Sequence, residues 1–348
     1  MRNLQQRTHK TLLALACAAI TTPALAGSLE TEFSDIRVSG GASGGYVYAD
    51  SEITRQTDQS RLMDFLLGID ASTRDGRAEI SAGVGILPAY ALMDEGVDEA
   101  GSGAEVQYAE VIVHPSDSWT LELGKMPSNV GFEDTIMYNN ANVMESVQAI
   151  TQPGFFNAAR LSYGNDNFSV YAEQGDEEYE APSGATSGQS WSAGAMGSAG
   201  GVEYVVGYHG YAGLRTLFDL IVSGNVGGMD VTVAVDRLKL EDAALASPTD
   251  TNHAESVAIY VSGPTAGEFS FPIRIEAFDD HSNGLYGNSN GGAGKGNSLT
   301  ITPTWNISEN AFLRSDISYL KTDNKIFNDK GTMKDSRMGI ALQAGYRL

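Results

Sequence analysis

The chain has 348 residues, of which 44 are acidic and 22 basic, so its formal charge is −22. Hydrophobic residues make up 42% of the sequence, which excludes a chain that is disordered throughout. The acidic excess argues against nucleic acid as a partner, because a phosphate-binding surface needs clustered Lys and Arg. Beyond the N-terminal segment, no run of about 18 apolar residues predicts a membrane helix, but a membrane β-barrel needs no such run, since only alternate residues of its strands face lipid.

The N-terminal segment has the features of a secretory signal peptide. Three basic residues lie within the first ten, an apolar stretch follows, and Ala24-Leu25-Ala26 matches a small-residue cleavage site. We therefore expect a signal peptide at 1–26 and one barrel domain at 27–348. Cleavage removes Cys17, the only cysteine, and with it any disulfide or thiolate site. An acylated Cys17 is the less favoured alternative, because Ala14-Leu15-Ala16 matches a lipobox poorly.

From residue 35 onward, apolar and polar residues alternate with a period of two, which predicts β-strands with one apolar and one polar side. The segments are roughly ten residues long, which is the length that a tilted membrane strand needs. About sixteen of them follow one another, at 35–48, 61–72, 78–87, 105–114, 119–126, 156–163, 168–174, 189–198, 202–209, 216–225, 229–240, 255–262, 268–279, 299–307, 311–320 and 337–346.

The connections between these segments alternate in length. Short turns that contain Gly, Asn, Asp or Pro follow every second segment, and most of the intervening links are much longer. The link at 210–215 is the one brief member of the long set. Short turns on one rim and long loops on the other are typical of a bacterial outer-membrane barrel, with both termini on the periplasmic side.

The two sides of the segments differ in charge. Apolar residues such as Leu123, Ile275 and Ile317 predict an outward belt, and Tyr and Trp near strand ends, Tyr260 among them, predict aromatic girdles. A charge at mid-strand costs about 2–4 kcal/mol if it faces lipid, so the charged side must face an aqueous lumen. That side carries Arg37, Asp64, Asp70, Glu79, Glu110, Glu122, Arg160, Glu173, Glu203, Asp219, Asp236, Arg274, Glu276, Arg314 and Asp316. We therefore predict an all-β fold, an antiparallel up-and-down transmembrane barrel of about 16 strands.

The longest connection, 127–155, is predicted to fold inward as a constriction loop. Its apolar spacing over 141–150 suggests a helix, and a loop of this length in a compact fold usually has a function. An inward loop would set its acidic residues opposite basic residues of the wall, creating a transverse field. The predicted pore residues are Lys125, Glu133, Asp134, Glu145, Arg160, Arg37, Glu122, Arg314 and Asp316. A loop packed on the external rim is the alternative.

Several residues in this region resemble those of a known family. Leu123-Gly124-Lys125-Met126-Pro127, Gly131-Phe132-Glu133, Asn139, Asn142 and Pro153-Gly154, with Gly44-Gly45-Tyr46-Val47-Tyr48 in the opening strand, are similar to the putative β-barrel porin-2 family of outer-membrane proteins. The resemblance implies a barrel over about residues 30–348 and a porin-type function. It carries over no individual pore residue.

Catalytic and metal-binding interpretations are weaker. Gly41-Ala42-Ser43-Gly44-Gly45 fits a nucleophile elbow, but an elbow needs a strand-to-helix turn and this segment continues as a strand. We expect no enzyme activity, no cofactor and no metal site. Acidic loop clusters such as Asp94-Glu95 could bind Ca²⁺ or Mg²⁺, although a solvated acidic surface is the simpler interpretation.

The sequence thus favours an outer-membrane porin of a Gram-negative bacterium for passive diffusion of small hydrophilic solutes and ions. Eleven acidic against four basic inward residues predict a weak cation preference. The expected partners are outer-membrane lipid, lipopolysaccharide and the solutes, and a homotrimer is left open. The alternative function is a closed barrel that acts as a surface receptor, adhesin or structural anchor.

Overall fold

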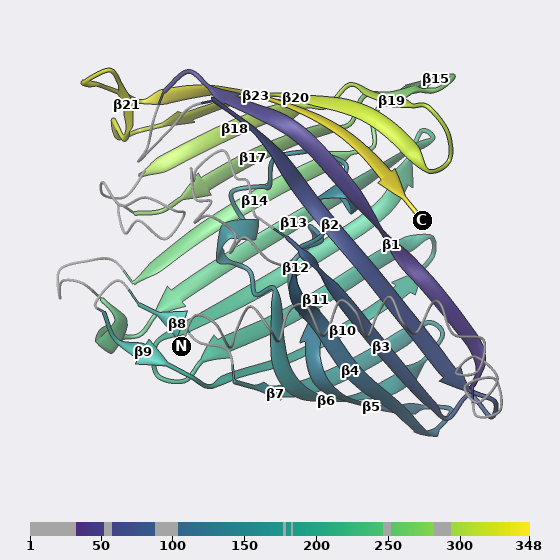
Figure 1. The fold of residues 1–348 in the computed structure, drawn as a ribbon. Helices are drawn as coiled ribbons and strands as arrows, with labels where there is room; N and C mark the ends of the chain where they lie inside the picture. The colour runs from purple at the N-terminus through teal and green to yellow at the C-terminus, as the bar shows by residue number, and fades with distance from the viewer. Residues whose placement is uncertain are drawn as a thin grey trace, which may run out of the picture.

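The computed structural model describes residues 33–51, 58–87, 104–176, 179–181, 184–245, 252–281 and 294–348. Their strands form one antiparallel sheet that closes on itself, because β1 (Phe33–Ala49) pairs with β23 (Ser336–Arg347) (Figure 1). No helix among the described residues is long and apolar enough to cross a membrane.

Sixteen strands form the barrel wall, in agreement with the sequence prediction. Three of these strands are interrupted. The strand of β14 continues as β15. The strand of β16 continues as β17 after Pro272, and the strand of β18 continues as β19 after Pro303, because proline lacks the N–H that a β-ladder needs. Between β1 and β23 the strands are β2 (Asp58–Thr73), β3 (Ala78–Ile86), β4 (Glu105–Ser116), β5 (Trp119–Pro127), β6 (Phe155–Asn165), β7 (Phe168–Gly175), β10 (Ser190–Ala199), β11 (Val202–Tyr211), β12 (Arg215–Val226), β13 (Met229–Leu240), β14 (His253–Val261), β15 (Thr265–Ala266), β16 (Phe269–Ser270), β17 (Ile273–Asp279), β18 (Lys295–Ile301), β19 (Thr304–Asn306) and β20 (Ala311–Thr322).

The two rims differ as the connection lengths predicted. Links of a few residues join β2 to β3, β4 to β5, β6 to β7, β10 to β11 and β12 to β13 on one rim. The N-terminal end of β1 and the end of β23 lie on this rim, where the Arg347 N–H donates to the Asn310 carbonyl in the β19–β20 turn. On the other rim the long connections contain two small hairpins, β8 (Tyr179–Glu180) with β9 (Thr186–Ser187) and β21 (Phe327–Asp329) with β22 (Thr332–Lys334).

Side-chain burial alternates along the strands of the barrel. In β20 and β23 every second side chain is buried, and the residues between them are exposed on the outside. The exposed set includes Leu123, Ile275 and Ile317, as expected for an apolar belt. Aromatic pairs also lie on this outer surface, such as Trp119 with Tyr163, whose ring centroids are 4.9 Å apart.

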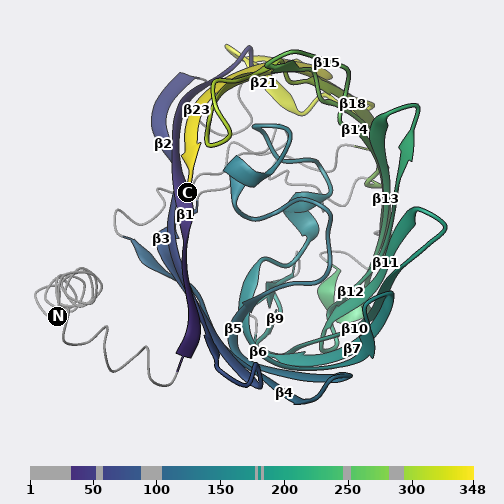
Figure 2. The same cartoon turned by 90° about the vertical axis from the view of Figure 1, so that its right-hand side faces the viewer.

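Glycines on the inner side of the wall make room for aromatic rings. A Cβ atom at Gly83 would lie 2.3 Å from the ring of Tyr108, and one at Gly345 would lie 2.3 Å from the ring of Phe312. These rings therefore lie close against the backbone of the neighbouring strand. The largest apolar core of the molecule is inside the barrel, where residues of the β5–β6 connection pack against the wall (Figure 2).

Candidate functional site

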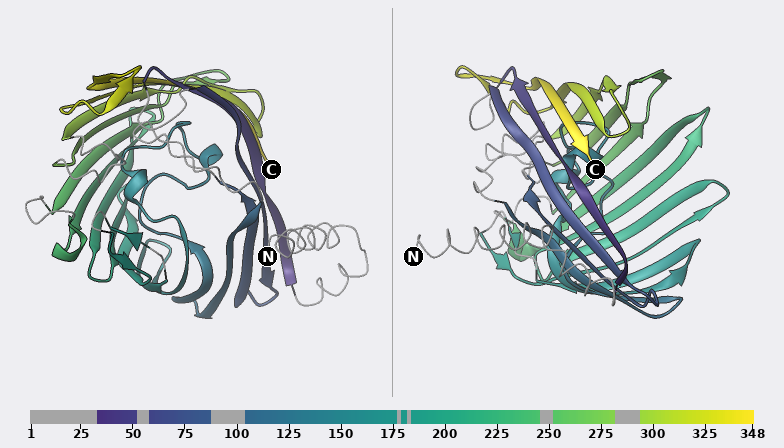
Figure 3. Two further views of the ribbon diagram at one scale, coloured as in Figure 1. Left: turned by 60° about the vertical axis from the view of Figure 1, so that its left-hand side comes forward. Right: turned by 45° about the vertical axis from the view of Figure 1, so that its right-hand side comes forward.

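The connection between β5 and β6, residues 128–154, lies inside the ring of strands and is called the inward loop here (Figures 2 and 3). Its inward course confirms the prediction of an inward-folded loop. The predicted helix over 141–150 is wrong. The loop contains only two 3₁₀ turns, η1 (Met137–Asn139) and η2 (Ala149–Thr151).

Wall carboxylates explain why no helix forms. The backbone N–H groups of the loop donate to side chains of distant strands instead of to carbonyls one turn earlier. The Asp316 carboxylate accepts from Val143 at 2.9 Å and from Met144 at 2.7 Å. The other acceptors are Glu276 for Val147 (2.6 Å), Asp64 for Tyr138 (2.8 Å) and Asp219 for Gly131 (3.0 Å).

A guanidinium group joins the middle of the loop to β17. Arg274 is fully buried and bridges two carboxylates, with 2.7 Å between its Nη1 and Glu133 Oε1 and 3.1 Å between its Nε and Glu276 Oε2. It also donates to the carbonyls of Met144 and Glu145 at 2.8 and 3.1 Å. All three charges are therefore paired and hydrogen-bonded, as buried ions must be.

Three further arginines hold the loop through its carbonyls. Arg314 donates to Met137 O at 2.8 Å and to Asn140 O. Arg215 donates to Thr151 O, and Arg160 donates at 2.5 Å to the carbonyl of Pro127, the last residue of β5 before the loop. The arginines bind backbone carbonyls and the acids bind backbone N–H groups. The wall therefore supplies hydrogen-bond partners for both acceptors and donors of the loop backbone.

Apolar side chains complete the attachment. Met137, Val143 and Val147 of the loop are each at most 2% exposed and pack with wall residues such as Leu217 and Leu238. Tyr138 is buried in a second cluster with Leu66 and Phe312. Burial, together with the carboxylates of Asp64 and Asp134, raises the pKa of Tyr138 to about 12.

The predicted pore residues have different surroundings from those expected. The basic partner of Glu133 is Arg274, not Lys125 or Arg160. Arg160 instead pairs with Glu173 at 2.7 Å and with Glu122 at 3.3 Å, both on the wall.

Lys125 requires a correction. It alternates with Met126, which is buried inside, and shares the outward side of β5 with Leu123, while its Nζ lies 2.9 Å from Val106 O. Lys125 therefore does not face the loop across the lumen. Arg37, near the start of β1, pairs with Asp35 at 3.2 Å, and both side chains are exposed.

The remaining predicted residues take part in the loop or in its attachment. Asp134 closes a local turn, accepting from Ile136 N and Asn139 Nδ2. Glu145 contributes its carbonyl to Arg274, and Arg314 and Asp316 bind the loop backbone as described above. Sequence reasoning placed Asp64, Asp219, Arg274 and Glu276 on the inner wall but did not identify them as anchors. Mid-strand charge was the only signal.

A different environment exists on β2, β3 and β4. Asp70 accepts a hydrogen bond from Ser81 Oγ at 2.6 Å, and Glu110 has one buried carboxylate oxygen without a hydrogen-bond partner. Within the part of the chain that the structure describes, neither carboxylate forms an ion pair, and the same is true of Asp134 and Asp230. The acidic groups without a basic partner are thus distributed between the wall and the loop.

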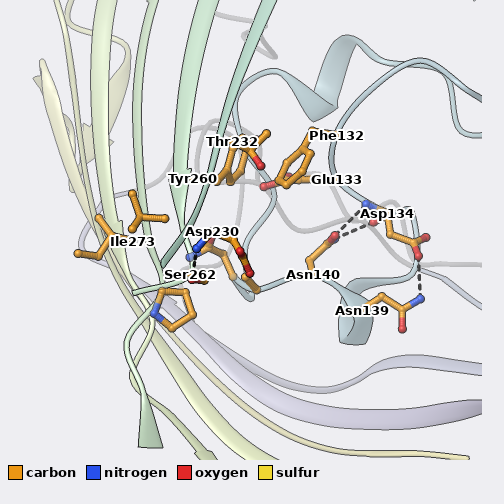
Figure 4. Close-up of a pocket in the computed structure, with 14 residues that line it drawn as sticks. Phe132, Glu133, Asp134, Asn139, Asn140, Asp230, Thr232, Tyr260, Ser262 and Ile273 are labelled. Carbon is orange, nitrogen blue, oxygen red and sulfur yellow. Dashed lines mark hydrogen bonds between the residues drawn. The ribbon is translucent and has the colours of Figure 1, made fainter. Parts of the chain in front are cut away.

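A cavity of about 340 Å³ lies between the inward loop and strands β13, β14 and β17 (Figure 4). Phe132, Glu133, Asp134, Asn139 and Asn140 line it from the loop. Asp230, Thr232, Tyr260 and Ser262 line it from the wall. Tyr260, expected in the outer girdle, is instead an inward residue that is 7% exposed. An adjoining cavity of about 760 Å³ extends to the short-turn rim at Gly227, Gly228 and Gly263.

The Ser43 segment is a strand, not an elbow. Ser43 lies within β1, and its hydroxyl donates to the Asp64 carboxylate. The same hydroxyl accepts from Gln343 Nε2 at 2.7 Å. The Ser43 hydroxyl is therefore part of a hydrogen-bond network of the wall.

The fold is that of known porins. An anion-selective porin from Comamonas acidovorans is similar with a TM-score of 0.61 at 13% identity, over 90% of this chain and 99% of that chain. OmpF of Salmonella typhi, in complex with daunomycin, is similar with a TM-score of 0.61 at 10% identity, over 90% and 97%. OmpT of Vibrio cholerae, in its trimer form, is similar with a TM-score of 0.56 at 12% identity, over 90% and 99%.

None of the curated proteins compared with the sequence matches it. Residues 35–348 match the model of the family described as putative beta-barrel porin-2, OmpL-like. That match covers nearly all of the chain, and the chain belongs to this porin family.

Proposed function

We propose that the chain is a porin of the outer membrane through which small hydrophilic solutes diffuse passively, with a weak preference for cations. The observation that carries this proposal is the inward loop, which lies inside the ring of strands (Figure 2) and whose backbone is bound by wall charges. The family and the porin neighbours support a channel of this kind.

The cation preference rests on which charges lack a partner. Arg160, Arg274 and Arg314 are committed to carboxylates or loop carbonyls. Asp70, Glu110, Asp134 and Asp230 form no ion pair within the described residues, so the field of the lining is negative. An anion-selective porin has the same fold, so the sign of selectivity must depend on such lining charges and not on the barrel itself.

Planar-bilayer recordings in a salt gradient test both parts. We expect single-channel steps and a reversal potential of the cation-selective sign. A reversal potential of the opposite sign would overturn the cation preference, and a membrane without any steps would overturn the pore.

Deleting 139–150 tests the inward loop as the constriction. The deletion should raise the single-channel conductance, because it removes backbone and apolar side chains from the lumen. A conductance equal to that of the intact chain would mean that the narrowest point lies elsewhere.

We further propose that the exposed apolar belt contacts outer-membrane lipid and lipopolysaccharide, and that a homotrimer is the assembly to test. One OmpT structure of this fold is described as a trimer form. Chemical cross-linking in native outer membranes would show a ladder ending at three copies, whereas a single band would argue for a monomer.

A further inference from the structure

We propose that the cavity between the inward loop and strands β13, β14 and β17 is a binding subsite for organic ammonium ions. The inference deepens the proposed function and rests on it, because the ligand reaches the cavity through the lumen. It identifies the solute class that the channel retains longest, beyond a general preference for cations.

The charged residues that line the cavity are all acidic. Its lining contains Glu133, Asp134 and Asp230 and no Lys, Arg or His. Glu133 is neutralised by Arg274, but Asp134 and Asp230 are exposed and have no basic partner among the described residues. A cation that enters therefore meets two carboxylates without displacing an existing counter-charge.

These two carboxylates are held in place before any ligand arrives. Asp134 accepts from Ile136 N at 2.9 Å and from Asn139 Nδ2 at 2.7 Å. Asp230 accepts from Asn225 Nδ2 at 3.0 Å, and its N–H donates to Ser262 Oγ at 3.0 Å. Binding thus requires little further ordering of the acidic groups.

An aromatic ring faces the same space. Phe132 is 39% exposed, and behind it lies Tyr260, with 4.4 Å between the ring centroids and 47° between the planes (Figure 4). An apolar ring exposed in a polar cavity offers its negative face to a cation. Carboxylates with an aromatic face suit an alkylammonium group better than a small metal ion, since the methyl groups shed water at low cost and contact the ring.

The geometry of access is one-sided. The 340 Å³ cavity has room for a small organic ion, and it shares Asn139, Asn140 and Asp230 with the larger cavity that extends to the short-turn rim. A ligand added on that side reaches the subsite without passing the loop.

The test uses choline and its uncharged isostere, 3,3-dimethylbutan-1-ol, on the intact channel in a planar bilayer. We expect choline to reduce the potassium current in a saturable manner, more strongly from the short-turn side. The isostere should have no comparable effect. Equal block by both compounds would indicate an apolar site and overturn the proposal, as would choline block that never saturates.

Variants assign the effect to the cavity. Phe132→Leu should raise the half-blocking concentration of choline by about threefold or more, whereas Phe132→Tyr should retain the block. Asp230→Asn should weaken the block similarly. Asp117→Asn removes an exposed acid from another short turn and is the matched control, for which we expect no change. Equal block in Phe132→Leu and in the intact chain would overturn the assignment.

Two readouts separate this inference from the proposed function. A channel that conducts with cation preference but ignores choline contradicts only the subsite. If the chain forms no channel, the proposed function fails. Calorimetric titration of the detergent-solubilised barrel with choline then still tests the subsite. Binding heat that is smaller in Phe132→Leu supports the subsite, and no binding heat overturns it.

Discussion

The wall of β12, β17 and β20 and the wall of β2–β4 carry inward charges in the same alternating pattern, but these charges have different partners. On the first wall, Arg274, Glu276 and Asp316 are buried and bind the inward loop. On the second, Asp64 also binds the loop, but Asp70 and Glu110 have no ion pair among the described residues. Mid-strand charge thus indicates that a residue faces inward, but not whether it binds protein or faces solute. We propose that the charges that bind the loop govern where it lies, and that the charges without an ion pair govern which ions pass.

The largest effect should come from removing the cation at the centre of the loop attachment. Arg274→Ala leaves Glu133 and Glu276 buried without their partner, which typically costs about 3–5 kcal/mol of unfolding free energy. Urea unfolding in detergent measures it, and we also expect a larger and noisier conductance as the loop detaches.

The exposed pair of Arg237 and Glu255, 3.3 Å apart on the outer side, is the control for that change. Arg237→Ala should cost no more than about 1 kcal/mol, because both side chains are more than half exposed and exposed pairs contribute little. Similar losses in both variants would mean that the loop does not depend on Arg274.

Alkaline pH should detach the loop by a second route. The pKa of Tyr138 is raised to about 12 in the folded chain from an ordinary value of 10.0. Because the unfolded chain ionises first, the stability contributed by the neutral phenol is complete below pH 10 and is lost as the pH rises towards about 12. Tyr138→Phe should flatten this part of the curve of unfolding free energy against pH. Tyr163→Phe, in the exposed girdle, should leave it unchanged.

The strands could be predicted because they depend on local pattern, and the inward course of the loop could be predicted from the length and acidic residues of the connection. The helix prediction at 141–150 failed because the partners of the loop N–H groups lie far away in sequence: Asp316 is 172 positions from Met144. The inward placement of Lys125 conflicts with the outward placement of Leu123, since residues two apart in a strand share a side. Tyr260 could not be placed by type, because an aromatic near a strand end suits a girdle as well as a lumen.

A smaller change, an increase in the unfolding free energy, is expected from a substitution beneath the loop. Asp219 and Asp236 face each other across β12 and β13, and each has one buried oxygen without a hydrogen-bond partner. Their other oxygens bind Gly131 N and Gln152 Nε2. Asp236→Asn retains an acceptor for Gln152 and gives Asp219 a donor, so it should raise the unfolding free energy by about 1 kcal/mol. Asp236→Ala, which supplies no donor, should not, and a loss of stability in Asp236→Asn would show that both carboxyl groups are needed.

The smallest change in stability, and the most direct test of the second wall, is Glu110→Gln. The side chain lies on β4 and binds no part of the loop in the described residues, so the unfolding free energy should change by no more than about 0.5 kcal/mol. The side chain lies on the inner side of the wall, so at alkaline pH, where the carboxyl group is ionised, the reversal potential in a salt gradient should move toward zero when Gln replaces it. Glu255→Gln, an outward acid, is the matched control and should leave the reversal potential unchanged. If instead Glu110→Gln destabilises the barrel and leaves selectivity intact, the two walls do not divide anchoring from ion selection, and Glu110 belongs with the anchors.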